Sequence, residues 1–258
     1  MREYTLQLYK EMVTAIKSNY NNIIRFDDYL SCNQKPSRFC IIRHDVDRKP
    51  GFALEMAKLE SSLGVKAAYY FRASGSSFNP KVIQYIHYLG HEIGYHYENL
   101  SATAGDINKA LIDFEENLSN FRKIVPISTI SMHGRPFSIF DNRDLWKNPG
   151  LHARLRDQYH LLGEVYLDIN YEDVLYLSDT GRNWISRKYN FRDTVISNID
   201  LDFSTSIDLL NYLQGAPHPK LVFQIHPERW TDNILQWYLQ FINDMCVNLA
   251  KSIFRGIR

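Results

Sequence analysis

Two aspartates stand two residues apart where an apolar segment of the chain ends. Residues 39–42 form a short run of the kind typical of a buried strand, and Asp45 and Asp47 follow it. Side chains two apart on an extended backbone point the same way, so these carboxylates repel each other unless a cation lies near them. A bound metal ion, with one carboxylate as ligand and the other as base, is one solution. The alternative is a loop whose aspartates cap the next helix or pair with Arg43 and Arg48.

Three later apolar segments each end in a histidine: His96, His133 and His226. In a parallel α/β barrel the carboxyl ends of all strands lie on one face, which is where such folds carry their chemistry. We therefore expect these histidines to converge with Asp45 and Asp47, although far apart in the sequence. The alternative is that each histidine is satisfied separately.

Histidine and aspartate side chains together suit zinc or another borderline divalent ion. Such an ion lowers the pKa of a water molecule to about 7 and makes it a usable nucleophile. A second carboxylate can take the proton of that water, and a separate histidine can protonate the leaving group. The residue types therefore predict a metal-dependent hydrolase, without naming the bond that it cleaves.

The elements that position these residues alternate between strand and helix along the chain. A run of alternating strands and helices with short connections predicts parallel strands joined by right-handed crossovers. With 258 residues and no linker or repeat, the sequence predicts one α/β barrel domain spanning residues 1–258, with a helix at each end. The expected strands are residues 23–26, 39–42, 67–71, 91–96, 127–132, 161–167, 174–178 and 221–225.

Bulk composition excludes several classes of partner. The formal net charge is +1, which suggests neither nucleic acid nor an anionic membrane as partner. No stretch approaches the roughly 18 apolar residues of a membrane span, and the N-terminus lacks the apolar segment of a secretory signal. The three cysteines lack metal-site spacing and fit a reduced setting. We expect a cytoplasmic protein without a membrane span.

Four motifs of this chain resemble those of the polysaccharide deacetylase superfamily, the metal-dependent carbohydrate de-N-acetylases. Asp45-Val46-Asp47 is similar to the opening Asp-x-Asp motif, and residues 90–96, GHEIGYH, are similar to the second motif. Arg135-Pro136-Phe137 resembles an Arg-Pro-aromatic third motif, and residues 221–226 resemble the last one. The resemblance implies a distorted TIM-like barrel of seven or eight β/α units.

The resemblance also implies roles for individual residues. Asp45 would be the base that activates water, and Arg135 would orient it. Asp47 and His96 would bind the metal, for which zinc is expected. His226 would be the general acid that protonates the leaving amine.

The chain departs from the family pattern at one metal ligand. The family usually has a second metal histidine four residues after the first, and Leu100 stands there in this chain. His133 is the natural substitute as third ligand, and Glu98 is the runner-up. The departure leaves room for a related activity on an ester, a phosphoester or a cyclic amide, or for a sugar-binding relative without catalysis.

Residues 178–184, SDTGRNW, resemble a stretch in cytosolic relatives associated with surface-polysaccharide and O-antigen synthesis. The resemblance implies removal of an N-acetyl group from a small or carrier-linked sugar, such as a nucleotide- or lipid-linked one. Asp179 and Arg182 are candidates for binding substrate hydroxyls or phosphate, and Trp184 and Trp230 for stacking on the sugar. The alternative for this stretch is a simple β-turn.

Overall fold

The computed structural model of the chain describes residues 2–135, 137–185, 190 and 192–257. Its seven strands form one sheet, in which every paired neighbour runs parallel. The predicted α/β class with parallel strands is therefore confirmed. The strands are β1 (Phe39–Val46), β2 (Ala68–Phe71), β3 (Glu92–Tyr97), β4 (Thr129–Met132), β5 (Gly163–Glu164), β6 (Leu175–Ser178) and β7 (Lys220–Ile225).

The sheet has the order β5-β4-β3-β2-β1-β7-β6, so β1 lies near its centre and β5 and β6 lie at its two edges. No ladder joins β5 to β6 in the described part of the chain, and the sheet is a half-barrel. A TIM-like barrel is compatible with this order, but closure remains an expectation. The central position of β1 explains why all of its residues are buried.

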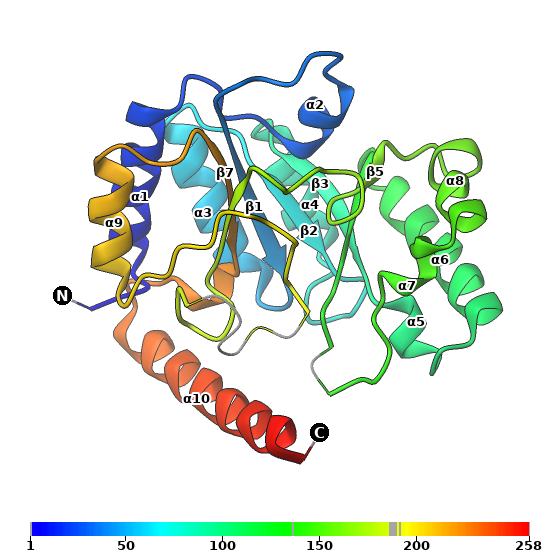
Figure 1. Cartoon of the computed structure of the whole chain (residues 1–258). Coiled ribbons are helices and arrows are strands. Elements are labelled where there is room, and N and C mark those ends of the chain that lie inside the picture. Colours follow the sequence, from blue (N-terminus) through cyan, green and yellow to red (C-terminus); the bar gives the residue numbers. More distant parts are fainter. Residues whose placement is uncertain (1, 136, 186–189, 191, 258) are drawn as a thin grey trace.

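Helices lie behind the sheet and beside its two edges in Figure 1, and loops cross in front of it. α1, α3 and α9 are grouped beside β1 and β7, and α5 to α8 are grouped on the β5 side. The described residues form α1 (Leu6–Asn19), α2 (Phe26–Ser31), α3 (Pro50–Ser62), α4 (Pro80–Tyr88), α5 (Asn99–Ala102), α6 (Ile107–Arg122), α7 (Asp144–Lys147), α8 (Pro149–Asp157), α9 (Ser206–Gln214), α10 (Ile234–Ile257) and the short 3₁₀ helix η1 (Pro227–Arg229).

Two of the expected strands are wrong in extent or type. Residues 161–167 contribute only the two-residue β5, because the carboxylate of Asp168 turns back to accept a hydrogen bond from the Glu164 N–H. Residues 23–26 contribute a single bridge between Ile23 and Cys40 before α2 begins at Phe26. Local apolar composition cannot distinguish a strand from a segment that merely touches the sheet edge.

Successive residues of β1 point to opposite sides of the sheet. Arg43 and Asp45 lie on one side, where they contact each other and Tyr166. His44 lies on the other side, where it contacts Glu60 of α3 and Tyr9 of α1. His44 is therefore part of the packing between sheet and helices, and not part of the cluster that the strand ends predict.

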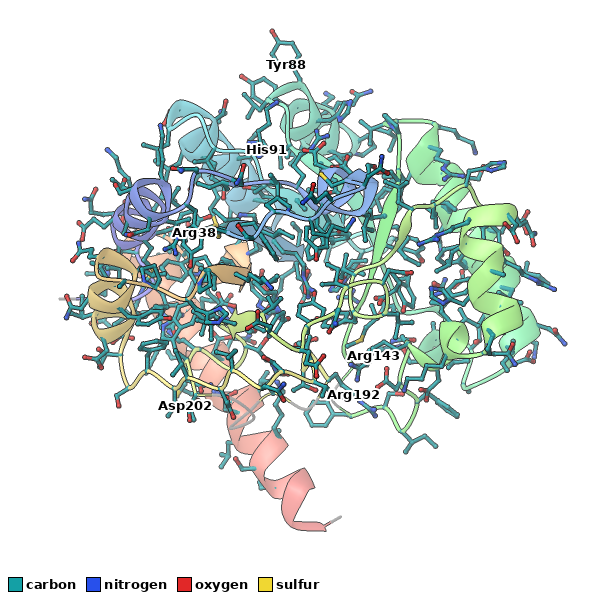
Figure 2. The ribbon with its side chains drawn as sticks, turned by 45° about the horizontal axis from the view of Figure 1, so that its top comes forward. Arg38, Tyr88, His91, Arg143, Arg192 and Asp202 are labelled. Atoms are coloured by element: carbon teal, nitrogen blue, oxygen red, sulfur yellow. The ribbon has the colours of Figure 1, made fainter. Side chains whose placement is uncertain are left out.

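The long segments after β4 and β6 are tied together by an ion-pair cluster. Asp141 pairs with Arg143 at 2.7 Å and with Arg192, fifty residues further along, at 3.5 Å. Both arginines lie in the same part of the molecule in Figure 2, away from Tyr88 at the tip of α4. In the described residues, no helix combines the length and the apolar character that crossing a bilayer requires.

Candidate metal and acid–base site

Three predicted metal ligands come together at the carboxyl ends of β1, β3 and β4. One ligand atom from each of Asp47, His96 and His133 lies within 4.8 Å of the others. The Oδ1 atom of Asp47 is 3.5 Å from Nε2 of His96 and 3.4 Å from Nε2 of His133. The convergence of these three residues, predicted from their positions at strand ends, is confirmed.

Hydrogen bonds to the far nitrogen of each ring orient both histidines. His96 Nδ1 donates to the Ser131 carbonyl oxygen at 3.0 Å, and His133 Nδ1 donates to a carboxylate oxygen of Glu98 at 2.9 Å. A carbonyl or carboxylate oxygen can only accept, so the Nδ1 atoms carry the protons and the Nε2 lone pairs are free to face a metal. Glu98 thus supports the ligand His133, which favours His133 over Glu98 as the third ligand.

The donor set fits a divalent cation. Oδ1 of Asp47 is buried, and no hydrogen-bond donor among the described residues satisfies it. Burial would raise the pKa of Asp47, but His133 and His96 beside it lower it well below its usual value. Burial would lower the pKa of His133, but Asp47 and Glu98 raise it to about 9. The cluster therefore favours the binding of a positive charge, and a metal ion would take the place of the second proton on His133.

Asp45, the candidate base, lies beside these ligands with its Oδ2 atom 3.7 Å from Nε2 of His96. It accepts two hydrogen bonds from Arg43, at 2.9 and 2.6 Å, and one from Gln224 at 3.0 Å. Burial would raise the pKa of Asp45, but Arg43 and His96 lower it, so the carboxylate is ionised at neutral pH.

The arginine that contacts Asp45 is Arg43, and the expectation that Arg135 orients Asp45 is wrong. Arg135 lies 3.6 Å from Glu98 and is nearly half exposed. The next residue of the expected third motif, Pro136, lies outside the described residues. Pairing with Arg43 was the alternative expected for the aspartates, and it holds for Asp45: Arg43 precedes Asp45 by two residues, so both point to the same side of β1.

The candidate general acid, His226, is oriented by a buried carboxylate. Its Nδ1 atom donates to Asp179 at 2.6 Å, and its backbone N–H bonds the same carboxylate at 3.1 Å. Burial and Arg229 would lower the pKa of His226, but Asp179 raises it. Because Nδ1 is occupied, Nε2 is the atom that can give a proton to a leaving group. Gln224, within 3.4 Å of the imidazole, links His226 to Asp45.

Asp179, predicted to bind substrate, is fully buried, and its carboxylate is committed to neighbouring side chains of the protein. Besides His226, it accepts hydrogen bonds from Arg229 at 3.0 Å and from the Trp230 indole at 2.8 Å. Trp230, predicted to stack on a sugar, is also buried. Both residues position the imidazole of His226.

Arg182 and Trp184 have contacts within the protein as well, and their predicted substrate contacts stay a prediction. The guanidinium of Arg182 pairs with Asp244 at 3.4 Å and lies over the Tyr4 ring at 4.6 Å. The Trp184 ring stacks on Phe223 at 5.6 Å and is 3% exposed. The turn at residues 178–184 thus anchors the strand end.

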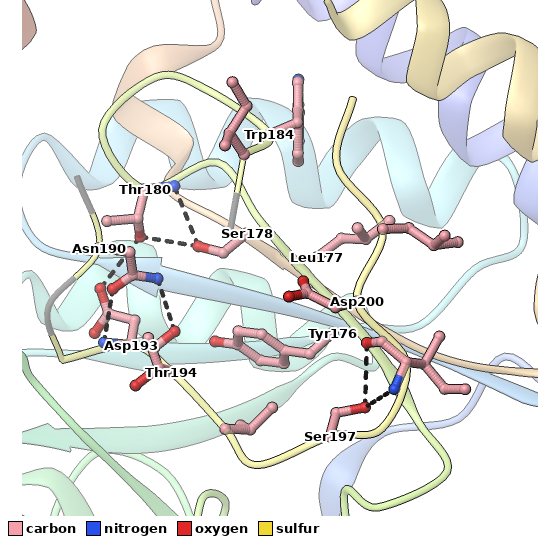
Figure 3. Close-up of a pocket in the computed structure, with 14 residues that line it drawn as sticks. Tyr176, Leu177, Ser178, Thr180, Trp184, Asn190, Asp193, Thr194, Ser197 and Asp200 are labelled. Atoms are coloured by element: carbon pink, nitrogen blue, oxygen red, sulfur yellow. Dashed lines mark hydrogen bonds between the residues drawn. The ribbon is translucent and has the colours of Figure 1, made fainter. Parts of the chain in front are cut away.

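A pocket lies at the end of β6 (Figure 3). Ser178 on its wall donates to Gln224, which in turn donates to Asp45. Thr180 donates to Asp193 across the pocket at 3.2 Å. Hydroxyl, amide and carboxylate groups on its wall can exchange hydrogen bonds with a polyhydroxylated ligand. Its lining includes Ser178, Thr180, Trp184, Asn190, Asp193, Thr194, Ser197 and Asp200.

No protein-family model matches the chain, and no curated protein matches it either.

Proposed function

We propose that the chain is a metal-dependent hydrolase that removes an N-acyl group, an acetyl group in the expected case, from a sugar. The observation that carries the proposal is the juxtaposition of a three-ligand metal cluster with an ionised carboxylate, Asp45, and a carboxylate-oriented histidine, His226. Gln224 bridges the base and the acid, so the two groups belong to one site. These are the parts that hydrolysis of an amide requires.

Asp47, His96 and His133 would bind the divalent ion, for which zinc suits the mixed nitrogen and oxygen donors. A bound ion would supply polarisation of the acyl oxygen and a water of lowered pKa. Asp45, held by Arg43 and ionised, accepts the proton of the attacking water. His226, whose pKa is raised, then gives the proton that an amine needs before it can leave.

The choice of a sugar as substrate is supported by the sequence motifs that resemble polysaccharide deacetylases and by the polar pocket at the end of β6, which Ser178 and Gln224 connect to Asp45 by hydrogen bonds. The resemblance further suggests a sugar of surface-polysaccharide or O-antigen synthesis, free or bound to a carrier. A histidine oriented to donate a proton favours an amide over an ester, because an amine is a poorer leaving group than an alcohol and depends more on protonation.

The test is acetate release from matched N-acetylated and O-acetylated sugars, with zinc and after chelation, alongside metal analysis of protein purified without chelators. We expect zinc-dependent release from the N-acetylated members. Release from esters alone would contradict the amide assignment, and failure to bind any added divalent metal would contradict the mechanism.

An Asp45→Asn variant separates the two aspartates. We expect it to retain bound metal while turnover falls by about 10²–10⁴-fold, as for the loss of a general base. Asp173→Asn, at an exposed aspartate, is the matched control. Loss of metal from Asp45→Asn would mean that Asp45 and Asp47 have exchanged roles.

A further inference from the structure

The outer face of α10 is unusually apolar for a solvent-facing helix. More than half of the large apolar side chains that the described residues expose lie on this one helix, and their exposure ranges from 36 to 66%. Figure 1 shows α10 along the lower edge of the body, with the C-terminus at its far end. The nine residues are Ile234, Leu235, Tyr238, Leu239, Phe241, Ile242, Met245, Leu249 and Ile253.

One row of polar side chains of α10 points inward, the reverse of a normal surface helix. Gln240, Asp244 and Asn248 recur every four residues and are at most 4% exposed. Asn248 donates to the Gly181 carbonyl at 2.8 Å, and Asp244 pairs with Arg182 at 3.4 Å. These contacts fix the rotation of the helix, so the apolar face is held outward by specific bonds.

The exposed apolar residues have the spacing of a helix-pairing seam. Leu235, Ile242 and Leu249 are seven residues apart, and Tyr238 and Met245 fall between them at positions three further on. Such a three-four repeat presents one stripe to a neighbouring helix. The repeat therefore indicates a partner that supplies a helix of similar spacing, rather than a flat or irregular surface.

The distribution of charged side chains on α10 favours one kind of partner for this apolar face over another. Of the side chains of α10 from residue 234 to 253, the two that carry charge, Asp244 and Lys251, are both buried. A helix that lies on an anionic bilayer usually presents lysines and arginines around its apolar stripe, and residues 234–253 have none facing outward. An uncharged stripe, by contrast, can meet an identical stripe without electrostatic repulsion.

We propose that the α10 face binds the same face of a second copy of this chain, forming a symmetric dimer. The nine side chains expose on the order of 1,000 Å² of apolar surface, against about 800 Å² per partner in a standard protein interface. In a single twofold contact the α10 face of one copy meets the α10 face of the other. No second α10 face is then left to extend the assembly. The metal ligands lie outside α10, so dimer formation does not depend on the proposed activity.

The test is the mass of the full-length protein by sedimentation velocity and light scattering, across roughly 1 to 100 μM. We expect a dimer for the unmodified protein. Ile242→Glu combined with Leu249→Glu places like charges across the seam and should raise the dissociation constant by at least about a hundredfold. Leu235→Lys tests the same face independently at the start of the helix, should the double variant fold poorly.

Ile112→Glu is the matched control, since Ile112 is 68% exposed on α6, outside the α10 face, and its substitution should leave the dimer intact. Far-ultraviolet circular dichroism verifies that each variant is folded. A monomer at every concentration, or a dimer indifferent to both α10 variants, would overturn the proposal. Flotation of the monomeric protein with neutral or anionic vesicles would identify a bilayer as the occupant and would overturn it equally.

Discussion

The protonation of His226 depends on a balance between its burial and its charged neighbours. Burial and the positive charge of Arg229 favour the neutral imidazole, whereas the carboxylate of Asp179, 2.6 Å from Nδ1, favours the charged form. The net effect raises the pKa, so His226 retains its proton to a higher pH than a free histidine. The raised pKa suits a group that must donate a proton near neutral pH.

Replacing Asp179 by asparagine removes the carboxylate that does most to raise the pKa of His226, ahead of Asp47. We expect the basic limb of the pH profile of kcat to move to lower pH by about one to two units, because the imidazolium loses its stabilising charge. The measurement is kcat against pH with an N-acetylated sugar. Asp173→Asn, which removes an exposed carboxylate, should leave the limb in place, and an unmoved limb in Asp179→Asn would disprove the role assigned to Asp179.

Glu98 acts on the metal site through His133. The pKa of Glu98 is lowered to about 2, since His133 and Arg72 outweigh the effect of its burial, so it is ionised and can bind the Nδ1 proton of His133. We expect Glu98→Gln to weaken zinc binding by about 10–100-fold, as other partners of metal-bound histidines do when replaced. Competition with a chromophoric chelator near neutral pH measures this. Glu116→Gln, at an exposed glutamate on α6, is the control, and equal affinities for the two variants would refute the assignment.

At the residue scale, sequence reasoning succeeds where a residue's role depends on its strand and fails where the role depends on a partner. The metal ligands follow from strand ends on one face. The roles of Arg43 and Asp179 depend on which side chains meet in space, and Asp179 contacts His226 across 47 residues of sequence. Spacing of two residues pairs Arg43 with Asp45, but no local signal pairs Asp179 with His226.

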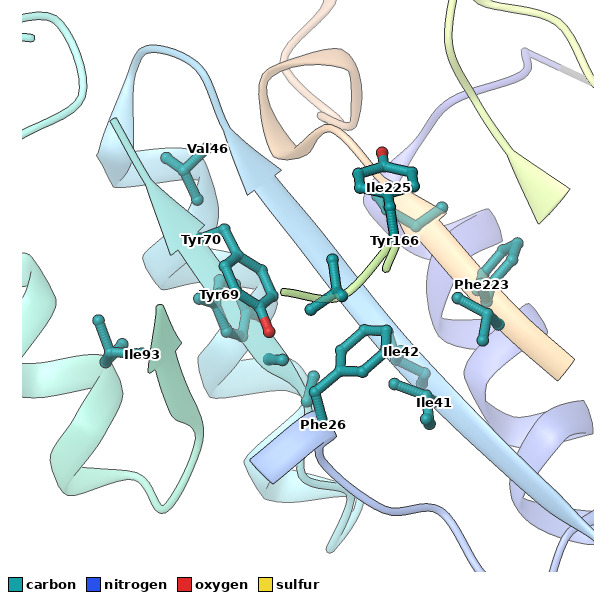
Figure 4. Packing of buried hydrophobic residues seen from close by; sticks show 14 of the residues in the cluster. Phe26, Ile41, Ile42, Val46, Tyr69, Tyr70, Ile93, Tyr166, Phe223 and Ile225 are labelled. Atoms are coloured by element: carbon teal, nitrogen blue, oxygen red, sulfur yellow. The ribbon is translucent and has the colours of Figure 1, made fainter. Parts of the chain in front are cut away.

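At the element scale, the absence of a side chain at Gly94 lets strand β3 pack closely against strand β2. A methyl group at this position would lie 2.2 Å from the ring of Tyr70 and 3.1 Å from the Thr129 carbonyl oxygen. The Tyr70 ring cannot easily move, because its hydroxyl is hydrogen-bonded to the Thr129 side chain at 2.7 Å. Figure 4 shows Tyr70 within the buried cluster beside β1. Gly94 thus permits the close approach that places His96 at the end of β3.

We expect Gly94→Ala to lower the free energy of unfolding by about 1–3 kcal/mol, the usual cost of forcing an extra carbon into a packed core. Urea unfolding followed by tryptophan fluorescence measures it. The matched control is Gly51→Ala on α3, where nothing lies within 4 Å of the added carbon. Because alanine favours helix over glycine, this control should be neutral or slightly stabilising. A neutral Gly94→Ala would show that β2 and β3 can separate without cost.

The helices and strands with a clear apolar pattern or capping signal were the ones that could be predicted from the sequence. The parallel strands β1 to β4 and β7 were indicated by apolar runs, and α9 by the Thr205 cap, which forms a capping box with Asp208. For the edge strand β5 the apolar run predicted too much, residues 161–167, because only the two residues held by contacts with β4 and with Asp168 are in the sheet. Edge strands this short carry no apolar pattern of their own.

At the scale of the whole molecule, Arg43 connects the centre of the sheet to both of its edges. Its guanidinium lies 4.6 Å from the ring of Tyr166, just beyond β5, and the Tyr166 hydroxyl lies 3.4 Å from that of Tyr176 on β6. Two edge segments can meet over a central strand only if the sheet is curved. The curvature brings the residues that follow β5 and β6 over the site side of β1.

A divalent metal ion should stabilise this fold as a whole, because its three ligands come from three different strand ends. Zinc at one hundred times its dissociation constant contributes about 2.7 kcal/mol. For a chain of this size we expect the melting temperature to rise by roughly 5–10 °C. Scanning calorimetry of chelated and zinc-loaded protein measures the shift. His133→Ala should abolish most of it, whereas His87→Ala, at an exposed histidine of α4, should retain it. A shift of equal size in both variants would mean that zinc binds elsewhere on the molecule.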